Sequence, residues 1–262
     1  MSGHTPCEPR AARTFQRVRA NLLLAYLPTP GALRLRSRAV SEEGATFLAA
    51  LSEDEVQALR ERATTRKFSR GTAVAHAGQA GDRVIVVLSG HVKLIRVTEN
   101  GRDVLLAIRG PGDLVGEQSA IDGQPRSASI VALDAVEALA LAPADFLAFL
   151  TATPNASLYV MRLLVARLRD ADRKRVEYAT QDVVGRLAGR LVELVERFGA
   201  DDGGSVRIDL PLTQEDLAGW VGASREATSR ALQQMRGLGW VTTERRAITV
   251  HDLDGLGRRA SA

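Results

Sequence analysis

The sequence predicts an α+β protein in which an antiparallel β domain precedes a long helix and a C-terminal winged helix-turn-helix. Three patterns support this fold class: short apolar runs separated by turn residues, an uninterrupted helical pattern after Pro154, and two short helices joined through a glycine and followed by two strands. The chain has 262 residues, which is enough for about two domains. Its hydrophobic content of 45% can fill their cores.

Residues 1–40 form a basic extension. This segment holds seven arginines and one acidic residue, so it carries a net charge of +6 and leaves −2 for the rest of a chain whose total is +4. Such a composition is typical of a disordered, solvated segment. A non-specific nucleic-acid-binding arm and a start codon placed too far upstream are the alternatives.

Residues 41–153 are expected to form the β domain, entered through a helical segment at 41–66. Ser52 is a suitable N-cap for that segment, with Glu55 at the third helical position. The apolar runs that follow are 84–88, 92–97, 104–108, 130–133 and 136–141. Short strands with a turn about every ten residues indicate an antiparallel sandwich or barrel. The pair Asn100-Gly101 predicts a tight hairpin, and residues 143–150 predict a short helix.

Residues 154–181 are expected to form a dimerisation helix and hinge. The helix places a set of side chains at alternating steps of three and four: Met161, Leu164, Leu168, Ala171, Arg175 and Tyr178. That spacing is typical of a coiled-coil seam, and it predicts a two-fold dimer. The alternative is an amphipathic helix that packs on its own domain.

Residues 182–262 are expected to form the winged helix-turn-helix. A helix at 182–198 and a loop at 199–204 precede the motif. Thr213 can cap a helix at 214–221 with Asp216 as its partner, and Gly222 can supply the positive φ of a tight turn. Ser224 can cap a second helix that runs to about residue 236. Strands at 240–242 and 247–250 then make the wing.

The start of the second helix has side chains that can read DNA. A helix in the major groove reads bases with its N-terminal residues. Arg225 and Arg230 can each hold a guanine, and Glu226 can accept from a cytosine amino group. Phosphates can be held by Thr213 and Ser224, and the wing arginines Arg245 and Arg246 add positive charge. The alternative is a helical hairpin with a solvated surface. Residues 180–262 hold 11 arginines and 12 acidic residues, so any basic footprint must be local.

Several other classes are disfavoured. No apolar run approaches the roughly 20 residues of a membrane span. Cys7 is the only cysteine, and the four histidines are scattered at positions 4, 76, 91 and 251. We therefore expect a cytoplasmic protein that is not an enzyme, needs no cofactor and binds no metal or membrane. A haem sensor stays open, because one histidine can ligate haem.

The segment Arg225-Glu226-Ala227-Thr228-Ser229-Arg230 resembles the recognition helix of the cAMP receptor protein family, also called the CRP/FNR family. Asp182-Val183-Val184-Gly185-Arg186-Leu187 resembles the start of that family's DNA-binding domain, and the resemblance covers residues 47 to 251. It implies a β-roll (jelly roll) of the cyclic-nucleotide-binding type at 41–153. It also implies a bacterial homodimeric transcription regulator that reads a TGTGA-like inverted repeat and works with RNA polymerase.

A second segment resembles the family's phosphate-binding cassette. It runs from Gly112 through Gly116 and Glu117 and continues at Pro125-Arg126-Ser127. The chemistry suits a cyclic phosphodiester, because Arg126 can fork onto the phosphate. The Ser127 hydroxyl can donate to the phosphate, and Glu117 can accept from the ribose hydroxyl. The alternative is a buried Glu117–Arg126 ion pair that only braces a loop.

The positions that match the family's base-contacting pair are Ala171 and Asp172, counted back from Asp182. Ala171 offers no hydrogen-bonding side chain, and an ionised Asp172 is only an acceptor. The resemblance therefore leaves the ligand open between cAMP and cGMP, with a preference for cGMP as the hypothesis. A nucleotide-independent regulator, one with another ligand such as haem, and a sensor module without transcription activity are the alternatives. An enzyme fused to the sensor has little room after residue 180.

Overall fold

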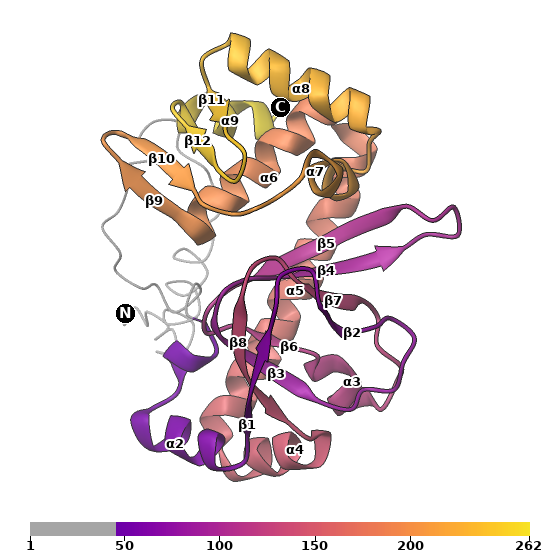
Figure 1. Ribbon diagram of the computed structural model, residues 1–262, viewed down its shortest axis with the longest axis vertical. Coiled ribbons are helices and arrows are strands. Elements are labelled where there is room, and N and C mark those ends of the chain that lie inside the picture. Colours follow the sequence, from indigo (N-terminus) through magenta and orange to yellow (C-terminus); the bar gives the residue numbers. More distant parts are fainter. Residues whose placement is uncertain (1–45) are drawn as a thin grey trace, which may run out of the picture. The chain divides into compact units, whose positions relative to one another are not determined.

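The computed structural model describes residues 46–262 (Figure 1), so the basic extension expected at 1–40 lies outside the described residues. Residues 64–141 form two four-stranded antiparallel sheets, which confirms the expected β-roll. The first sheet has the order β1 (Thr64–Phe68), β8 (Val136–Leu141), β3 (Val84–Ser89) and β6 (Leu114–Val115). The second has the order β2 (Ala73–Ala75), β7 (Ser129–Ala132), β4 (Val92–Val97) and β5 (Asp103–Arg109).

The apolar run of β3 is buried on both of its faces. Ile85 and Val87 pack with Val92 and Ile130 of the second sheet. Val84 and Val86 point the other way, into a cluster that includes Phe146 of the neighbouring helices. A strand covered on both faces reads as a continuous hydrophobic run, because alternate side chains both meet apolar surroundings.

Helices cover the outer face of the first sheet. They are the short 3₁₀ helix η1 (Leu48–Ala50), α2 (Glu53–Glu61), α4 (Pro143–Ala152) and the first part of α5 (Pro154–Thr180). Ser52 caps α2 in a reciprocal capping box with Glu55, as expected. The helical prediction for 41–66 is wrong beyond Glu61. Thr64 and Thr65 begin β1 instead, because β-branched residues suit a strand and pair there with β8.

The hairpin of β4 and β5 differs from the tight turn predicted at Asn100-Gly101. Its loop covers residues 98–102 and is closed by the Thr98 amide, which donates to the Arg102 carbonyl at 2.9 Å. Gly101 has a φ of 72°, which favours glycine because it has no Cβ. The hairpin is confirmed, and its loop is longer than a two-residue turn.

Helix α5 leaves an apolar stripe exposed, which overlaps the predicted seam without matching it at every position. Met161 and Leu168 are exposed as expected. Leu164 is half-buried and packs against the cluster around Phe47 of its own chain. Val165, one residue further on, is 50% exposed and takes its place in the stripe. The β-roll of the same chain therefore covers part of Leu164, and the dimer seam stays a prediction.

The C-terminal part places four helices around a four-stranded antiparallel sheet. The helices are α6 (Val183–Phe198), α7 (Gln214–Val221), α8 (Arg225–Gly237) and α9 (Leu253–Ala260). The sheet has the order β11 (Val241–Thr243), β12 (Ile248–Val250), β10 (Ser205–Ile208) and β9 (Gly199–Asp202). The helix-turn-helix with its wing is confirmed. The loop predicted at 199–204 is a β-hairpin instead, and Gly203 and Gly204 turn it with positive φ angles.

Within residues 46–262, no helix is both long and apolar enough to cross a membrane. The same part of the chain contains no group of three or more His, Cys, Asp or Glu side chains placed to hold a metal ion.

Candidate ligand pocket and DNA-reading surface

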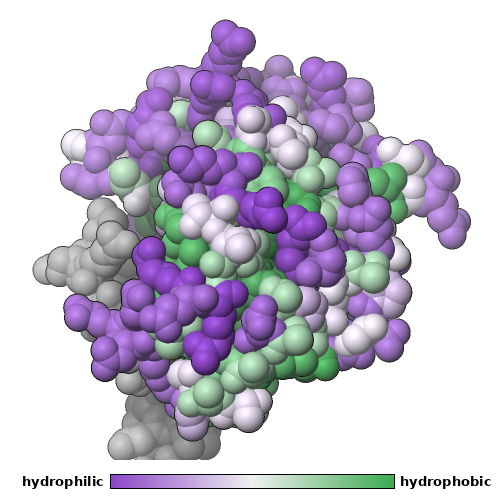
Figure 2. All heavy atoms as spheres, turned by 60° about the horizontal axis from the view of Figure 1, so that its bottom comes forward, coloured by the Kyte–Doolittle hydropathy of each residue, from purple (hydrophilic) through white to green (hydrophobic). Residues whose placement is uncertain are grey.

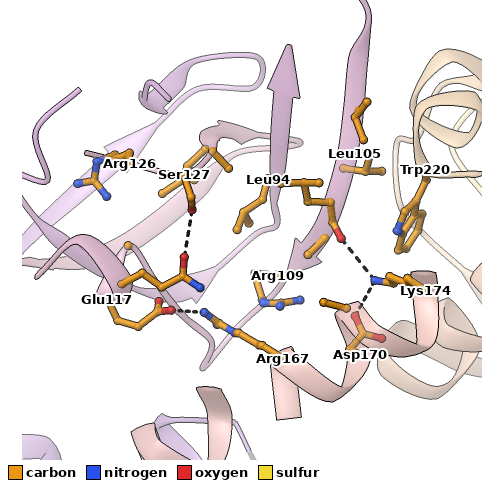
Figure 3. Close-up of a pocket in the computed structure, with 18 of the residues that line it drawn as sticks. Leu94, Leu105, Arg109, Glu117, Arg126, Ser127, Arg167, Asp170, Lys174 and Trp220 are labelled. Carbon is orange, nitrogen blue, oxygen red and sulfur yellow. Dashed lines mark hydrogen bonds and ion pairs between the residues drawn. The ribbon is translucent and has the colours of Figure 1, made fainter. Parts of the chain in front are cut away.

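A cavity of about 380 Å³ lies where the β-roll meets α5. Its walls come from β4 and β5, from the loops around Gly116 and Arg126, and from one face of α5 (Figure 3). Five residues that were predicted to bind a ligand from separate parts of the sequence line this one cavity: Gly116, Glu117, Arg126, Ser127 and Ala171.

Gly116 permits a close approach between the backbone and Arg126. Its φ is 82°, and a Cβ at this position would lie 2.6 Å from Arg126 Nη1. Only glycine fits such a position without moving the guanidinium. Gly116 immediately precedes the short helix α3 (Glu117–Asp122), which the sequence analysis did not predict. The backbone and the guanidinium thus form one compact wall of the cavity.

Arg126 is 5% exposed and anchored by two acceptors. Its Nη2 lies 3.1 Å from Asp82 Oδ1 and 2.7 Å from the Arg83 carbonyl oxygen. Hydrogen bonds donated by Arg83 and then by Arg126 lower the pKa of Asp82 to about 2, against the opposing effect of burial. Asp82 therefore stays ionised, while the Nη1 side of Arg126 faces Gly116 and the cavity wall.

Glu117 does not pair with Arg126, so the structure does not contain the ion pair that was the alternative to a nucleotide-binding role. Glu117 is 1% exposed and forms an ion pair with Arg167 of α5. The guanidinium of Arg167 also donates to the Leu114 carbonyl oxygen at 2.7 Å. Within residues 46–262, Glu117 Oε2 is buried and has no hydrogen-bond partner. A buried acceptor without a donor is costly, and a hydroxyl donor in the cavity would satisfy it.

Arg167 was missed by the sequence analysis although a signal was present. Ala171 lies four residues later, and residues i and i+4 share one face of a helix. The same reasoning adds Lys174, whose Nζ lies 2.7 Å from Asp170 Oδ2. Figure 3 places Asp170 and Lys174 at the far end of the cavity from Arg126 and Ser127, and Ala171 also lines the cavity.

Ser127 and Asp172 are placed differently. The Ser127 hydroxyl lines the cavity and donates to Gln118 Oε1 at 3.0 Å. Asp172 does not line the cavity of its own chain. Its side chain is exposed and lies 3.5 Å from Arg175 Nη1. Of the predicted base-contacting pair, the structure brings only Ala171 to this pocket.

The cavity is rich in positive charge. Arg109, Arg126, Arg167 and Lys174 line it, against the carboxylates of Glu117 and Asp170. Burial, followed by repulsion from Arg167 and Arg197, lowers the pKa of Arg109 to about 10. The guanidinium still carries its charge at neutral pH. A partly buried cluster of like charges disfavours its own ionisation, so an anion in the cavity would relieve this repulsion.

The predicted DNA-reading residues lie on an exposed helix start. Ser224 caps α8 by accepting a 3.1 Å hydrogen bond from the Ala227 amide. Arg225, Glu226 and Arg230 are all exposed. The Glu226 backbone amide, followed by the Ser224 hydroxyl, lowers the pKa of the Glu226 carboxyl. Glu226 is thus ionised at neutral pH and can accept a hydrogen bond.

The predicted phosphate-binding residues differ in whether their donors are already used: Thr213 is hydrogen-bonded, whereas the wing arginines are exposed. Thr213 caps α7 in a capping box, and its hydroxyl donates to Asp216 Oδ2 at 2.7 Å. The backbone amide of Thr213 also donates to Asp216 Oδ2, at 2.9 Å. The exposed Thr213 can therefore donate to a phosphate only after a shift. Arg245 and Arg246 are exposed in the turn between β11 and β12.

A β-roll joined by a long helix to a winged helix-turn-helix defines a DNA-binding transcription regulator. A family model described as a cyclic nucleotide-binding domain matches residues 65–153, and one described as a Crp-like helix-turn-helix domain matches residues 185–259. A CRP-like cAMP-activated global transcriptional regulator of Mycobacterium tuberculosis is 36% identical over 205 residues, covering 78% of this chain and 92% of that protein. The cyclic AMP receptor protein of Thermus thermophilus is 32% identical over 193 residues, covering 74% and 86%.

Solved structures share this fold. A CRP/FNR-family transcriptional regulator from Thermus thermophilus superposes with a TM-score of 0.62 at 28% identity, covering 76% of this chain and 99% of that chain. FixK2 from Bradyrhizobium japonicum gives a TM-score of 0.67 at 19% identity, covering 76% and 98%. The chain therefore belongs to the CRP/FNR family of bacterial DNA-binding transcription regulators, which confirms the resemblance seen in the sequence.

Proposed function

We propose that this regulator is controlled by a cyclic nucleotide bound in the β-roll cavity. The observation that carries the proposal is the buried Arg126 held against Gly116 at one end of a cationic cavity. A cyclic nucleotide has one negative charge, so its phosphate suits this end, with Ser127 as a second donor. The unpartnered Glu117 Oε2 suits the ribose 2′-hydroxyl.

The base of the nucleotide is assigned to the far end of the cavity, beside Ala171. Asp172 faces outward from its own chain, so it can serve only a cavity of a second subunit. We propose that it does so in a homodimer, where an ionised carboxylate can accept the N1–H and amino hydrogens of guanine. This arrangement favours cGMP over cAMP. The cAMP activation named for the Mycobacterium tuberculosis relative is the competing assignment.

Calorimetric titration of the dimer with cAMP and with cGMP tests both parts. Tighter binding of cGMP is expected. Equal or tighter binding of cAMP would remove the preference, and no heat with either nucleotide would remove the proposed ligand. Asp172→Asn is the matched variant, since it keeps the shape of the side chain and replaces one acceptor with a donor. This variant should reduce the difference in affinity between cGMP and cAMP.

The DNA-binding part is proposed to read a TGTGA-like inverted repeat as a dimer. Arg225, Glu226 and Arg230 read bases, whereas Thr213, Ser224, Arg245 and Arg246 hold the backbone. The bound nucleotide can shift DNA affinity only by binding the DNA-competent arrangement more tightly. A mobility-shift assay with the inverted repeat, with and without nucleotide, tests this linkage.

The remaining assignments are also proposals. The protein acts by binding rather than by catalysis, works in the cytoplasm and contacts RNA polymerase. The Mycobacterium tuberculosis relative is named as a transcriptional regulator, which supports these assignments. The functional boundaries are placed at residues 41–153 for the sensor, 154–181 for the dimerisation helix and hinge, and 182–262 for the DNA-binding domain. Recruitment of RNA polymerase can be measured by transcription from an operator-bearing promoter with purified components.

A further inference from the structure

The far wall of the cavity includes a residue of the helix-turn-helix itself. Trp220 lies on α7 and lines the same cavity as Arg126 and Glu117. Its side chain is 2% exposed. Its indole Nε1 has no hydrogen-bond partner among the described residues. A buried tryptophan N–H usually finds an acceptor, so this end of the cavity has an unused donor beside an aromatic ring.

A hydrogen bond, a close backbone approach and an ion pair position α7 against the β-roll and α5. The Tyr178 hydroxyl of α5 donates to the Trp220 carbonyl oxygen at 2.8 Å. At Gly219 a Cβ would lie 2.4 Å from the Asp103 carbonyl oxygen, so glycine is needed where α7 meets β5. Lys93 of β4 forms an ion pair with Asp216 near the start of α7. Trp220 is thus positioned by the sensor as well as by its own domain.

Figure 3 places Trp220 and Lys174 at the opposite end of the cavity from Arg126 and Ser127. A nucleotide with its phosphate at Arg126 extends its base toward Trp220. The small Ala171 side chain, which also lines the cavity, offers the base no hydrogen bond. The indole N–H of Trp220 is a donor that lies in the plane of the ring, so it can meet an acceptor on the edge of a base.

We infer that Trp220 contacts the base of the bound nucleotide through its indole N–H. This inference rests on the proposed nucleotide function of the cavity. It adds a specificity-determining residue supplied by the DNA-binding domain. The ligand then touches α7 directly, and α7 is the helix that precedes the recognition helix α8. Nucleotide binding is transmitted to the DNA-reading surface through this contact as well as along α5.

Two protein variants provide the test, because the chain has two tryptophans and Trp240 does not line the cavity. In Trp240→Phe, Trp220 is the only tryptophan and is unaltered. Its fluorescence should change on titration with cAMP or cGMP and saturate at the concentration given by calorimetry on the same protein. In Trp220→Phe, nucleotide affinity should fall about threefold to tenfold, as for a lost hydrogen bond. Trp240→Phe should keep the wild-type affinity.

The outcomes separate the inference from the proposed function. If wild-type protein binds neither nucleotide, the proposed function fails and the inference fails with it. If calorimetry shows binding but Trp220 fluorescence stays constant at saturation, the inference alone is overturned. The same follows if folded Trp220→Phe protein binds with unchanged affinity. Should Trp220→Phe not fold, the fluorescence of Trp240→Phe still decides.

Discussion

At the scale of single residues, the two sites of this protein depend on how arginines are held. Arg126 is buried and fixed by two acceptors, so it meets a ligand in a set orientation. Arg225 is exposed at the start of α8 and is free to fork onto a base edge. A fixed arginine suits a small anion in a cavity, whereas an exposed one suits a long polymer that arrives from solvent.

Replacing Arg225 with alanine should remove base discrimination at one position of each half-site. A bidentate arginine–guanine contact is worth about 1–3 kcal/mol of discrimination. Competition mobility-shift assays with operators substituted at single positions measure this. Arg246→Ala is the matched control, and it should weaken binding to all these operators alike. An unchanged base preference in Arg225→Ala would mean that α8 docks differently.

Replacing Arg126 with alanine should abolish the nucleotide response and leave the basal DNA affinity in place. The change removes the cation from the phosphate end of the cavity. It also removes one of the two cations at Asp82, which the arginine contacts at 3.1 Å and which stays paired with Arg83. Titration calorimetry and operator binding with and without nucleotide measure the two effects. The control Arg60→Ala removes an exposed arginine from α2 and should retain the response; full activation of Arg126→Ala would refute the phosphate assignment.

At the scale of elements, the β4–β5 hairpin and α7 form a contact between the β-roll and the winged helix-turn-helix. Lys93 and Asp216 face each other there, with both side chains mostly buried. Burial raises the pKa of Asp216, but hydrogen bonds from Lys93 and Thr213 lower it overall below its ordinary value. The carboxylate is therefore stabilised in its charged form by the contact between the two elements.

Lys93→Met should destabilise the folded protein by about 1–3 kcal/mol, because it leaves Asp216 partly buried without its cation. Urea unfolding measures the difference from wild type. A lowered folded-state pKa adds stability above the unfolded value of about 3.9. That stability is lost as the pH falls through the folded pKa. The difference in the free energy of unfolding between wild type and Lys93→Met should therefore disappear as the pH falls below 4. A difference that does not depend on pH would exclude this ion pair as its cause.

At the scale of the whole molecule, the surface still carries apolar side chains that one chain cannot cover. On α5 they include Met161, Val165 and Leu168, which is 62% exposed. Figure 2, viewed from the side of α2 and α4, shows hydrophobic atoms open at the surface among hydrophilic ones. Residues 161, 165 and 168 follow a heptad spacing, which is how two helices pair along a seam. A homodimer through α5 would bury them.

Leu168→Glu should convert a dimer into monomers, because it places a charge in the centre of the seam. Sedimentation equilibrium measures the change in mass. Leu238→Glu makes the same substitution at a leucine that is also exposed, but on the DNA-binding domain. It should leave the mass unchanged. A dimer that survives Leu168→Glu would place the interface elsewhere.

Much of the fold and part of the site followed from local patterns. The Ser52, Thr213 and Ser224 caps were predicted correctly, because capping depends on residues three positions apart. The start of β1 at Thr64 was missed, because its pairing partner β8 lies far away in the sequence. The hairpin at residues 199–208 was missed, because glycines and acidic residues at its turn are equally typical of a loop. The packing of Leu164 on its own β-roll was not predicted, since a heptad pattern does not tell which side of a helix its own domain covers.

The sequence by itself determined the fold class, the family and the exposed start of the recognition helix. Those features depend on the spacing of apolar, capping and turn residues and on local backbone preferences, which are properties of short sequence segments. Only the tertiary structure decided that Glu117 pairs with Arg167 rather than Arg126, and that Trp220 lines the same cavity as these residues. These contacts join residues about 50 to 100 positions apart. Their geometry is set by how the β-roll, α5 and α7 pack, and no local pattern records it.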